Sequence, residues 1–351
     1  MTGTPVDPVA VQAAPGRSFV LPEIVTRLPE DRHRDCRRLD ARTASRARPL
    51  LRAYFGDERR AERYLRQRIS HYGCLAFPQA DAERGRVLGD LCLAVTLYDD
   101  TFSRPGIQER TAAAGQLCAR WLEVFDGKAP SPEHPAFTLV HRAVEAADAL
   151  MPPHLAARAR QAWRDMAHSH HAEAVDRNNR VTLDLDHYVE RRLTNIYGWW
   201  LTTHVEFATG IDLGDLPATA QVMAARRAAI RHITLVNDLY SFPKELDAHE
   251  AMNVLLTFMR HDRLPLQRAV DRTAELIHRQ EAEFHRLRDG LLRGPLGRRA
   301  DVRAYLHGIG YLMTGNLRWS QISTRYFGDE HDGRPVTSGT VVLPRRPTVH
   351  T

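Results

Sequence analysis

Three oxygen-bearing side chains recur at four-residue steps within one short segment of the chain. They are Asn237, Ser241 and Glu245, in the run Asn-Asp-Leu-Tyr-Ser-Phe-Pro-Lys-Glu. Four residues of α-helix turn the chain by about 400° and rise by about 6 Å, so these side chains would lie on one slowly drifting stripe. A carboxamide, a hydroxyl and a carboxylate are hard ligands, and they suit Mg²⁺, which leaves room for phosphate oxygens. The spacing therefore predicts one wall of a magnesium and phosphate site.

A second acidic feature lies at the end of an apolar run. Asp99 and Asp100 follow the apolar stretch over residues 91–98. A lone pair of aspartates is usually a solvated helix end. Here the preceding apolar residues predict a helix buried on one face, with the two carboxylates at its mouth. We expect these carboxylates to form the second wall of the same site, opposite the first.

The elements that must position these residues are predicted to be helices. Apolar residues recur at steps of three and four, and the alternation typical of strands is scarce. Glycine and proline separate the helical segments, but no gap is long enough to be a domain linker. We therefore expect an all-α fold, a single helical bundle around a central apolar cavity. The pattern over residues 301–326 predicts one long final helix.

Both ends of the chain differ in composition from the middle. Residues 1–17 are rich in proline and alanine, show no signal-peptide pattern, and are predicted to be disordered. Residues 328–351 are punctuated by glycine and proline, and we expect a flexible tail with an apolar patch at residues 341–343. The helical domain is therefore expected to span residues 18–327.

Bulk composition argues against several classes of function. The chain has 351 residues, 43% of them hydrophobic, and a net charge of +6. Its arginines are spread among acids, without the basic cluster and interleaved aromatics that nucleic-acid binding needs. No apolar stretch is long enough to span a bilayer. The four cysteines, Cys36, Cys74, Cys92 and Cys118, lack paired or metal-ligand spacing, so we expect a cytoplasmic protein.

The two acidic segments together resemble those of bacterial class I terpene synthases. Further landmarks follow in the order of that family, and several landmarks in order are a stronger signal than any one alone. They are residues 18–22, 77–80, 188–192, 316–320 and 325–326. The resemblance covers the chain from about residue 19 to about residue 327.

The resemblance implies a fold and a chemistry. In this family a helical bundle holds a deep apolar cavity, and two oxygen-rich walls at its mouth hold three Mg²⁺ around a prenyl diphosphate. The protein is therefore expected to ionise a linear prenyl diphosphate, with C15 or C20 favoured, and to cyclise the carbocation to a hydrocarbon or an alcohol. The metal ligands would be Asp99, Asp100, Asn237, Ser241 and Glu245. A homodimer is one assembly that the resemblance allows.

The resemblance also assigns residues to the diphosphate. The family has a sensor arginine 46 residues before the triad asparagine, and Arg191 lies 46 residues before Asn237. Its planar fork suits two phosphate oxygens. Taken alone, Arg191 would be expected to form a surface salt bridge with Glu190 or Asp186, and its spacing to Asn237 is what favours the sensor. Lys244, Arg325 and Tyr326 would hold other diphosphate oxygens.

A carbocation must be kept from water by an apolar cavity with aromatic faces, whose quadrupoles stabilise positive charge. About half of the candidate aromatics are expected to be ordinary core residues. Asn195 stands where the family often has a glycine, and its side chain can supply an oxygen toward the cavity. The aromatic candidates are Phe77, Phe102, Trp319 and Trp200, together with Tyr98 and Trp199.

Two departures from the family pattern leave alternatives open. Ser103 and Arg104 stand where a third acid is usual, and Pro243 predicts a kink between Ser241 and Glu245. These features motivate a non-catalytic diphosphate-binding protein as one alternative. A prenyltransferase of the same bundle is another, although such enzymes use two aspartate-rich motifs and this chain has one.

A group of histidines also attracts notice. His168, His170 and His171 lack the four-residue step that would place two metal ligands on one helical face. We therefore expect these histidines to belong to a solvated helix face.

Overall fold

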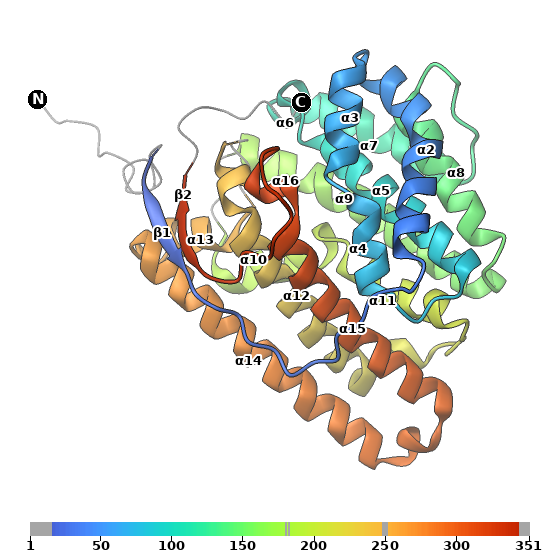
Figure 1. Cartoon of the computed structure of the whole chain (residues 1–351), viewed down its shortest axis with the longest axis vertical. Helices are drawn as coiled ribbons and strands as arrows, with labels where there is room; N and C mark the ends of the chain where they lie inside the picture. The colour runs from blue at the N-terminus through green and yellow to red at the C-terminus, as the bar shows by residue number, and fades with distance from the viewer. Residues whose placement is uncertain (1–15, 180, 182, 248–251, 344–351) are drawn as a thin grey trace, which may run out of the picture.

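The computed structural model describes residues 16–179, 181, 183–247 and 252–343 of the chain. Within these ranges the chain forms α-helices and one small antiparallel sheet, which confirms the all-α prediction (Figure 1). Most of the segment predicted to be disordered, residues 1–15, lies outside the described residues. The same holds for the end of the predicted tail, residues 344–351.

The elements follow one another with short connections, as the glycine and proline punctuation predicts. The first half of the chain contains β1 (Ser18–Leu21), α2 (Cys36–Phe55), α3 (Glu58–Arg66), α4 (Ile69–Ala76), α5 (Ala82–Phe102), α6 (Pro105–Gln108), α7 (Thr111–Phe125), α8 (Pro135–Asp148) and α9 (Pro153–Asn178). The second half contains α10 (Leu185–Asn195), α11 (Gly198–Thr209), η1 (Leu216–Ala218), α12 (Ala220–Asp247), α13 (Val254–Arg260), α14 (Leu266–Arg293), η2 (Pro295–Arg298), α15 (Ala300–Ile322), α16 (Thr324–Phe327) and β2 (Gly339–Val342).

The interior is built on α5, α11 and α12. These helices carry buried residues on most of their faces, which is the pattern of helices surrounded by protein. Helix α11 contacts α5, α12 and α15, while α12 also packs against α14. Asp81 starts α5 by accepting hydrogen bonds from the backbone N–H groups of Glu83 and Arg84. The cap fixes where α5 begins, and Asp99 and Asp100 lie in its last turn.

Helices α4 and α15 approach each other closely at a glycine. A Cβ added to Gly315 would lie 2.5 Å from the backbone nitrogen of Ala76, closer than any side chain allows. One consequence is that the ring of Tyr72 on α4 meets that of Trp319 on α15 edge-on, with centroids 5.7 Å apart. The glycine thus brings two aromatic residues together beneath the acidic end of α5.

The prediction of a single helix over residues 301–326 was wrong near its end. Helix α15 stops at Ile322 because Ser323 is extended, with φ −79° and ψ 126°. The hydroxyl of Ser323 then accepts the backbone N–H of Arg325 and starts the short helix α16. The break redirects Arg325 and Tyr326 relative to the face they would occupy on a continuous helix.

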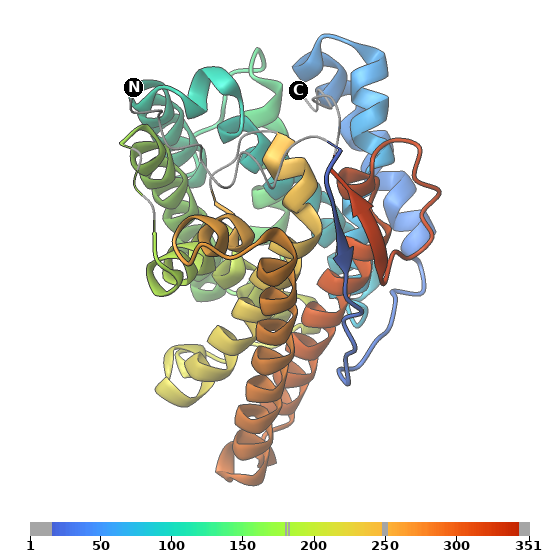
Figure 2. The same cartoon turned by 90° about the vertical axis from the view of Figure 1, so that its left-hand side faces the viewer.

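Part of the predicted flexible tail forms a strand. β2 pairs antiparallel with β1, so that Phe19 lies opposite Val341 (Figure 2). Phe19 and Leu21 alternate inward along β1, and Phe19 meets the ring of Phe242 on α12 at 6.2 Å between centroids. Leu343 is 1% exposed. The apolar patch at residues 341–343 is therefore used to fasten the tail to the bundle.

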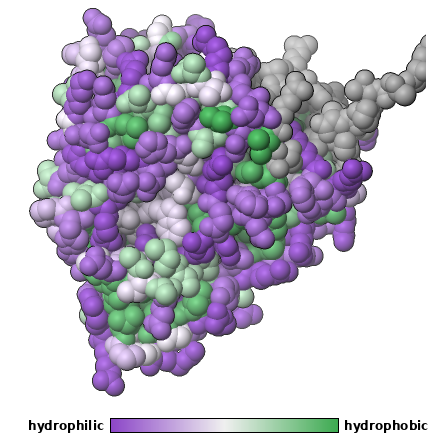
Figure 3. Space-filling model, turned by 180° about the vertical axis from the view of Figure 1, so that it is seen from behind, coloured by the Kyte–Doolittle hydropathy of each residue, from purple (hydrophilic) through white to green (hydrophobic). Residues whose placement is uncertain are grey.

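The outer surface is that of a protein packed around one interior. Hydrophilic residues cover most of the face seen from behind, with hydrophobic patches between them (Figure 3). In the described part of the chain, no helix combines the length and the apolar character needed to cross a membrane.

Candidate active site

One wall of the site is the last turn of α5. Asp99 lines a cavity at the mouth of the bundle, and its Oδ1 lies 2.9 Å from Nε2 of His170 on α9. Asp100 instead accepts Tyr64 Oη–H at 2.7 Å and Arg325 Nη2–H at 2.5 Å. The two neighbouring carboxylates therefore have different partners, and Asp100 is engaged with Arg325.

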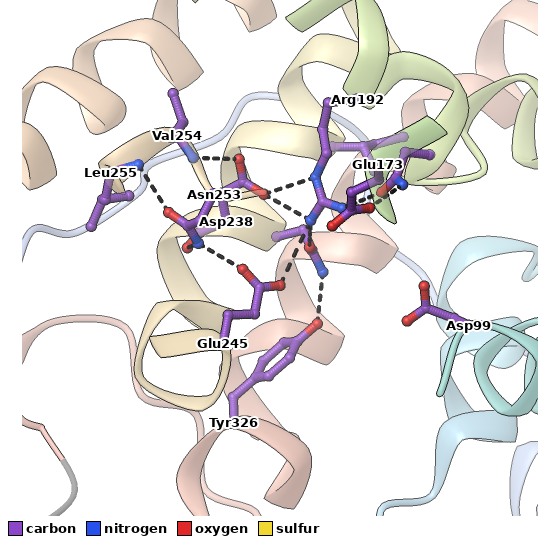
Figure 4. Close-up of polar contacts among 12 residues, drawn as sticks. Asp99, Glu173, Arg192, Asp238, Glu245, Asn253, Val254, Leu255 and Tyr326 are labelled. Atoms are coloured by element: carbon purple, nitrogen blue, oxygen red, sulfur yellow. Dashed lines mark hydrogen bonds and ion pairs between the residues drawn. The ribbon is translucent and has the colours of Figure 1, made fainter. Parts of the chain in front are cut away.

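The opposite wall is α12, and it carries the predicted triad. Asn237 Oδ1 accepts a hydrogen bond from Arg192 at 3.1 Å, and its Nδ2 donates to Tyr326 Oη at 2.7 Å. Glu245 Oε2 accepts from Asn253 Nδ2 at 2.8 Å. The three triad residues share α12, which continues past Pro243 to Asp247. Figure 4 shows this wall on one side and Asp99 on the other.

A buried ion pair supports the triad from behind. Asp238 is fully buried and accepts from Arg192 Nη2 at 3.0 Å, from the backbone N–H of Val254 at 3.1 Å and from the hydroxyl of Tyr188. Burial raises the pKa of Asp238, while Arg192 and Tyr188 act in the opposite direction. Burial by itself would lower the pKa of Arg192, but Asp238, Tyr188, Glu245 and Glu173 together outweigh it and raise that pKa well above its ordinary value. Arg192 is thereby fixed as a cation at the back of the mouth.

Both walls face one polar cavity, which encloses about 740 Å³ of empty space including its opening. The structure brings part of each predicted motif together there, whereas Asp100 and Ser241 are not among the lining residues. Asp99, Asn237, Lys244, Glu245, Arg325 and Tyr326 all line this mouth cavity.

An apolar cavity adjoins the mouth and encloses about 500 Å³ of empty space including its opening. Its walls include Ile69, Val95, Ile233 and Leu201. Asn237, Tyr197, Arg325 and Tyr326 line both cavities, together with Ile196. These shared residues form a collar between the polar and apolar spaces.

The donor set fits a hard divalent cation. Ser241 is 1% exposed, and its hydroxyl has no hydrogen-bond partner among the described residues. Ser241 shares α12 with the amide of Asn237 and the carboxylate of Glu245 at four-residue steps, and an unpartnered buried hydroxyl in such a set can bind a metal ion. No group of three or more His, Cys, Asp or Glu in the described ranges is placed to hold a metal ion. A metal ion bound here would therefore need oxygens from Asn237 or Ser241 as well as from carboxylates.

The adjacent arginines of α10 take different places from those predicted. Arg191, the predicted sensor, donates to Asp176 at 2.7 Å and lines neither cavity. Arg192 lines the mouth and bonds to Asn237. Successive residues of a helix point about 100° apart, so only one of the two can face the mouth. The structure therefore moves the arginine at the mouth from position 191 to position 192.

The predicted cavity residues also divide. Phe102 and Asn195 line the mouth, whereas Trp319 and Trp200 line the apolar cavity. Phe77 is 1% exposed and packs in the core outside both linings, because it follows the C-terminus of α4. Among the further candidates, Tyr98 lies in a cluster of aromatic rings, and Trp199 lies beneath Arg226. Ser103, in place of the third acid, lines the mouth.

His170 is the clearest residue that sequence reasoning placed wrongly. It is 5% exposed, and its Nδ1 lies 2.9 Å from the carbonyl oxygen of Met166, so Nδ1 carries a hydrogen. Burial lowers its pKa, but Asp99, with smaller contributions from Glu173 and the carbonyl of Met166, outweighs burial and raises it. Conversely, burial would raise the pKa of Asp99, yet His170, together with Lys244 and Arg325, lowers it to about 2. The signal was present: Trp163, Met166 and His170 recur at helical steps with other buried residues of α9.

Comparison with known proteins identifies the family. The model described as "Terpene synthase family 2, C-terminal metal binding" matches residues 90–283. A synthase named for (E)-2-epi-beta-caryophyllene from Selaginella moellendorffii is 28% identical over 322 residues, covering 88% of this chain and 86% of its own. The (+)-T-muurolol synthase of Roseiflexus castenholzii is 27% identical, covering 74% of this chain and 82% of its own.

Solved structures show the same fold. The linalool/nerolidol synthase of Streptomyces clavuligerus superposes with a TM-score of 0.72 at 22% sequence identity, covering 83% of this chain and 98% of that one. A reconstructed ancestral protein, SVS_A2 carrying an A224I substitution, gives a TM-score of 0.77 at 22% identity, with coverage of 86% and 89%. Since the matched family model spans more than half of its residues, the chain belongs to the terpene synthase family, with the metal-binding domain that this family shares.

Proposed function

We propose that this terpene synthase is a magnesium-dependent cyclase of a linear C15 prenyl diphosphate. The observation that carries the proposal is the direct contact between a polar mouth with two oxygen-bearing walls and an apolar cavity. The (+)-T-muurolol synthase to which this chain is similar is named as cyclising (2E,6E)-farnesyl diphosphate, which supports the chain length.

The residues of the mouth would bind and orient the diphosphate. Mg²⁺ held by Asp99, Asn237, Ser241 and Glu245 would stabilise the negative charge that develops on the leaving oxygens. Fixed cations and donors of the chain do the same without reorganising during the reaction. Arg192 is fixed by Asp238, and Arg325 is fixed by Asp100. Asp100 would therefore act by orienting Arg325 and not as a metal ligand.

The apolar cavity would then hold the hydrocarbon chain and exclude bulk water. Trp319 and Trp200 present aromatic rings to it, and such rings stabilise positive charge within about 6 Å of their centroids. The collar residues lie where the two cavities meet, so the hydrocarbon chain would enter the apolar cavity while the diphosphate stays in the mouth. Ionisation followed by cyclisation requires these two separate sites, one for the diphosphate and one for the hydrocarbon chain.

The direct test is incubation of the purified protein with C10, C15 and C20 prenyl diphosphates in the presence of Mg²⁺. We expect cyclic C15 products by gas chromatography and mass spectrometry, and none after chelation of the metal with EDTA. Release of a longer prenyl diphosphate would indicate a prenyltransferase instead. Absence of both diphosphate release and organic product with every substrate would contradict the proposal.

Variants of the triad give a second test. Asn237→Ala and Glu245→Ala should each abolish turnover, because each removes an oxygen donor from the wall on α12. Glu275→Ala is the matched control, since Glu275 is exposed and forms only a surface ion pair with Arg272. Full activity in both triad variants would show that this wall does not hold the metal.

A further inference from the structure

The apolar cavity contains a polar group that has no partner. Tyr72 on α4 lines this cavity, and its hydroxyl is buried without a hydrogen-bond partner among the described residues. A buried hydroxyl left unpaired costs about 1–3 kcal/mol of stability. Such groups in native structures commonly bind an ordered water or a ligand.

Tyr72 stands among other residues of the same cavity. Its ring meets the ring of Trp319 edge-on, with centroids 5.7 Å apart, and Trp319 also lines the cavity. Cys92, Tyr197 and Tyr326 line it as well. Burial raises the pKa of Tyr72 well above its usual range, and these three residues raise it further, so the hydroxyl keeps its proton and can donate it in a hydrogen bond.

Two more polar groups belong to the same cavity wall. Trp200 is fully buried, and its indole Nε1–H has no partner in the described part of the chain. Asn316 donates its Nδ2–H to the carbonyl oxygen of Ile233 at 3.2 Å, which leaves its Oδ1 as an acceptor. Thr96, by contrast, is satisfied by the carbonyl oxygen of Cys92 at 3.0 Å. A hydroxyl, an indole N–H and an amide oxygen are the kinds of group that bind a buried water, which needs two to four such partners.

We propose that the apolar cavity holds an ordered water bound by Tyr72, and that this water captures the final carbocation, so that the main product is a terpene alcohol. The inference rests on the proposed function and adds the class of product and the second reactant. It is a specific claim because a cyclase can equally end its reaction by losing a proton, which gives a hydrocarbon.

The chemistry balances without any further reactant. The water oxygen donates an electron pair to the cationic carbon, and a C–O bond forms. The resulting oxonium loses one proton, which goes to the diphosphate released in the first step. Tyr197 and Tyr326 line both cavities and so lie between the water and the diphosphate. Among the described residues that line the apolar cavity there is no aspartate, glutamate or histidine to act as a base toward carbon.

The test is product analysis in water enriched in ¹⁸O. Wild-type protein with farnesyl diphosphate and Mg²⁺ should give mainly a C15 alcohol carrying one ¹⁸O atom. Wild-type products that are hydrocarbons alone would overturn the inference while leaving the cyclase intact. Failure of the proposed function would look different, since no diphosphate would be released from any prenyl substrate.

A pair of tyrosine variants tests the residue. Tyr72→Phe removes only the hydroxyl and should lower the ratio of alcohol to hydrocarbon at least fivefold, with diphosphate release changed less than threefold. Tyr305→Phe is the control, because Tyr305 is also a buried tyrosine but lines neither cavity. The product ratio of this variant should stay that of the wild type. An unchanged ratio in Tyr72→Phe would overturn the assignment of the water to Tyr72. If that variant failed to fold, the ¹⁸O result for the wild type would still decide the product class.

Discussion

Replacing Asp238 by alanine is expected to destabilise the fold severely, because Asp238 compensates the charge of a buried arginine. Its carboxylate has no exposed surface and accepts from Arg192, from Tyr188 and from the N–H of Val254. Removing one partner of a buried ion pair costs about 3–5 kcal/mol, since the other charge remains buried. The two lost neutral hydrogen bonds act in the same direction. We expect Asp238→Ala to lower the free energy of unfolding by about 4 kcal/mol.

The measurement is urea unfolding followed by circular dichroism, without ligand. Asp329→Ala is the control, because Asp329 forms a 2.8 Å ion pair with Arg63 in which both side chains are about a third or more exposed. Exposed pairs contribute about 0–1 kcal/mol, so this variant should unfold nearly as the wild type does. A cost below about 1 kcal/mol for Asp238→Ala would refute the view that Arg192 depends on Asp238.

A double variant separates the charge from the shape. Arg192→Met with Asp238→Leu removes both charges together, and apolar replacement of a whole buried pair is often close to neutral. The double variant should therefore be more stable than Asp238→Ala, while its turnover should be lost with the guanidinium. If the double variant were the less stable of the two, the cost would come from packing and not from the unpaired charge.

Three further outcomes follow from other parts of the molecule. Arg192→Ala should lower kcat/KM by about 100-fold, as removal of a fixed donor at a developing charge does, whereas Arg191→Ala should lower it less than tenfold in the same steady-state assay. His204 is fully buried, and burial lowers its pKa to about 4. As the pH falls below about 6.5, the unfolded chain therefore binds a proton at His204 before the folded chain does, which destabilises the fold. His204→Gln lacks this site, so between pH 7 and pH 5 its free energy of unfolding should fall by about 2 kcal/mol less than that of the wild type. Gly315→Ala should lower the free energy of unfolding by about 1–3 kcal/mol, because the added methyl group clashes with α4. Gly290→Ala, which has open space around it, should instead raise the free energy of unfolding by about 0.5–1 kcal/mol. Equal effects at the two glycines would contradict the packing described for α4 and α15.

Local periodicity was enough to predict the helices and the two walls. Asn237, Ser241 and Glu245 share α12, and Asp99 faces them from the end of α5. Both features depend on steps of three and four residues within one helix, which are visible in a single sequence. The position of His170 was visible in the same way, from its spacing to the apolar residues of α9.

Other features depend on how distant segments meet. Which of Arg191 and Arg192 faces the mouth depends on how α10 rolls against α12, and neighbouring residues give no local signal for that roll. The pairing of β2 with β1 joins segments at opposite ends of the chain, so nothing near either strand predicts it. The helix break at Ser323 has no adjacent glycine or proline from which it could have been predicted.

That break connects the binding of the diphosphate with the sealing of the apolar cavity. Because α15 ends before Ser323, Arg325 can reach Asp100 on α5 while Tyr326 accepts a hydrogen bond from Asn237 on α12. The two residues thus link both walls of the mouth, and both also line the apolar cavity beneath. If the proposed diphosphate binds Arg325, it contacts a residue that also forms part of the collar above the apolar cavity. On the proposed function, the binding of the diphosphate and the exclusion of bulk water would therefore be coupled through the short helix α16, which starts at the cap formed by Ser323.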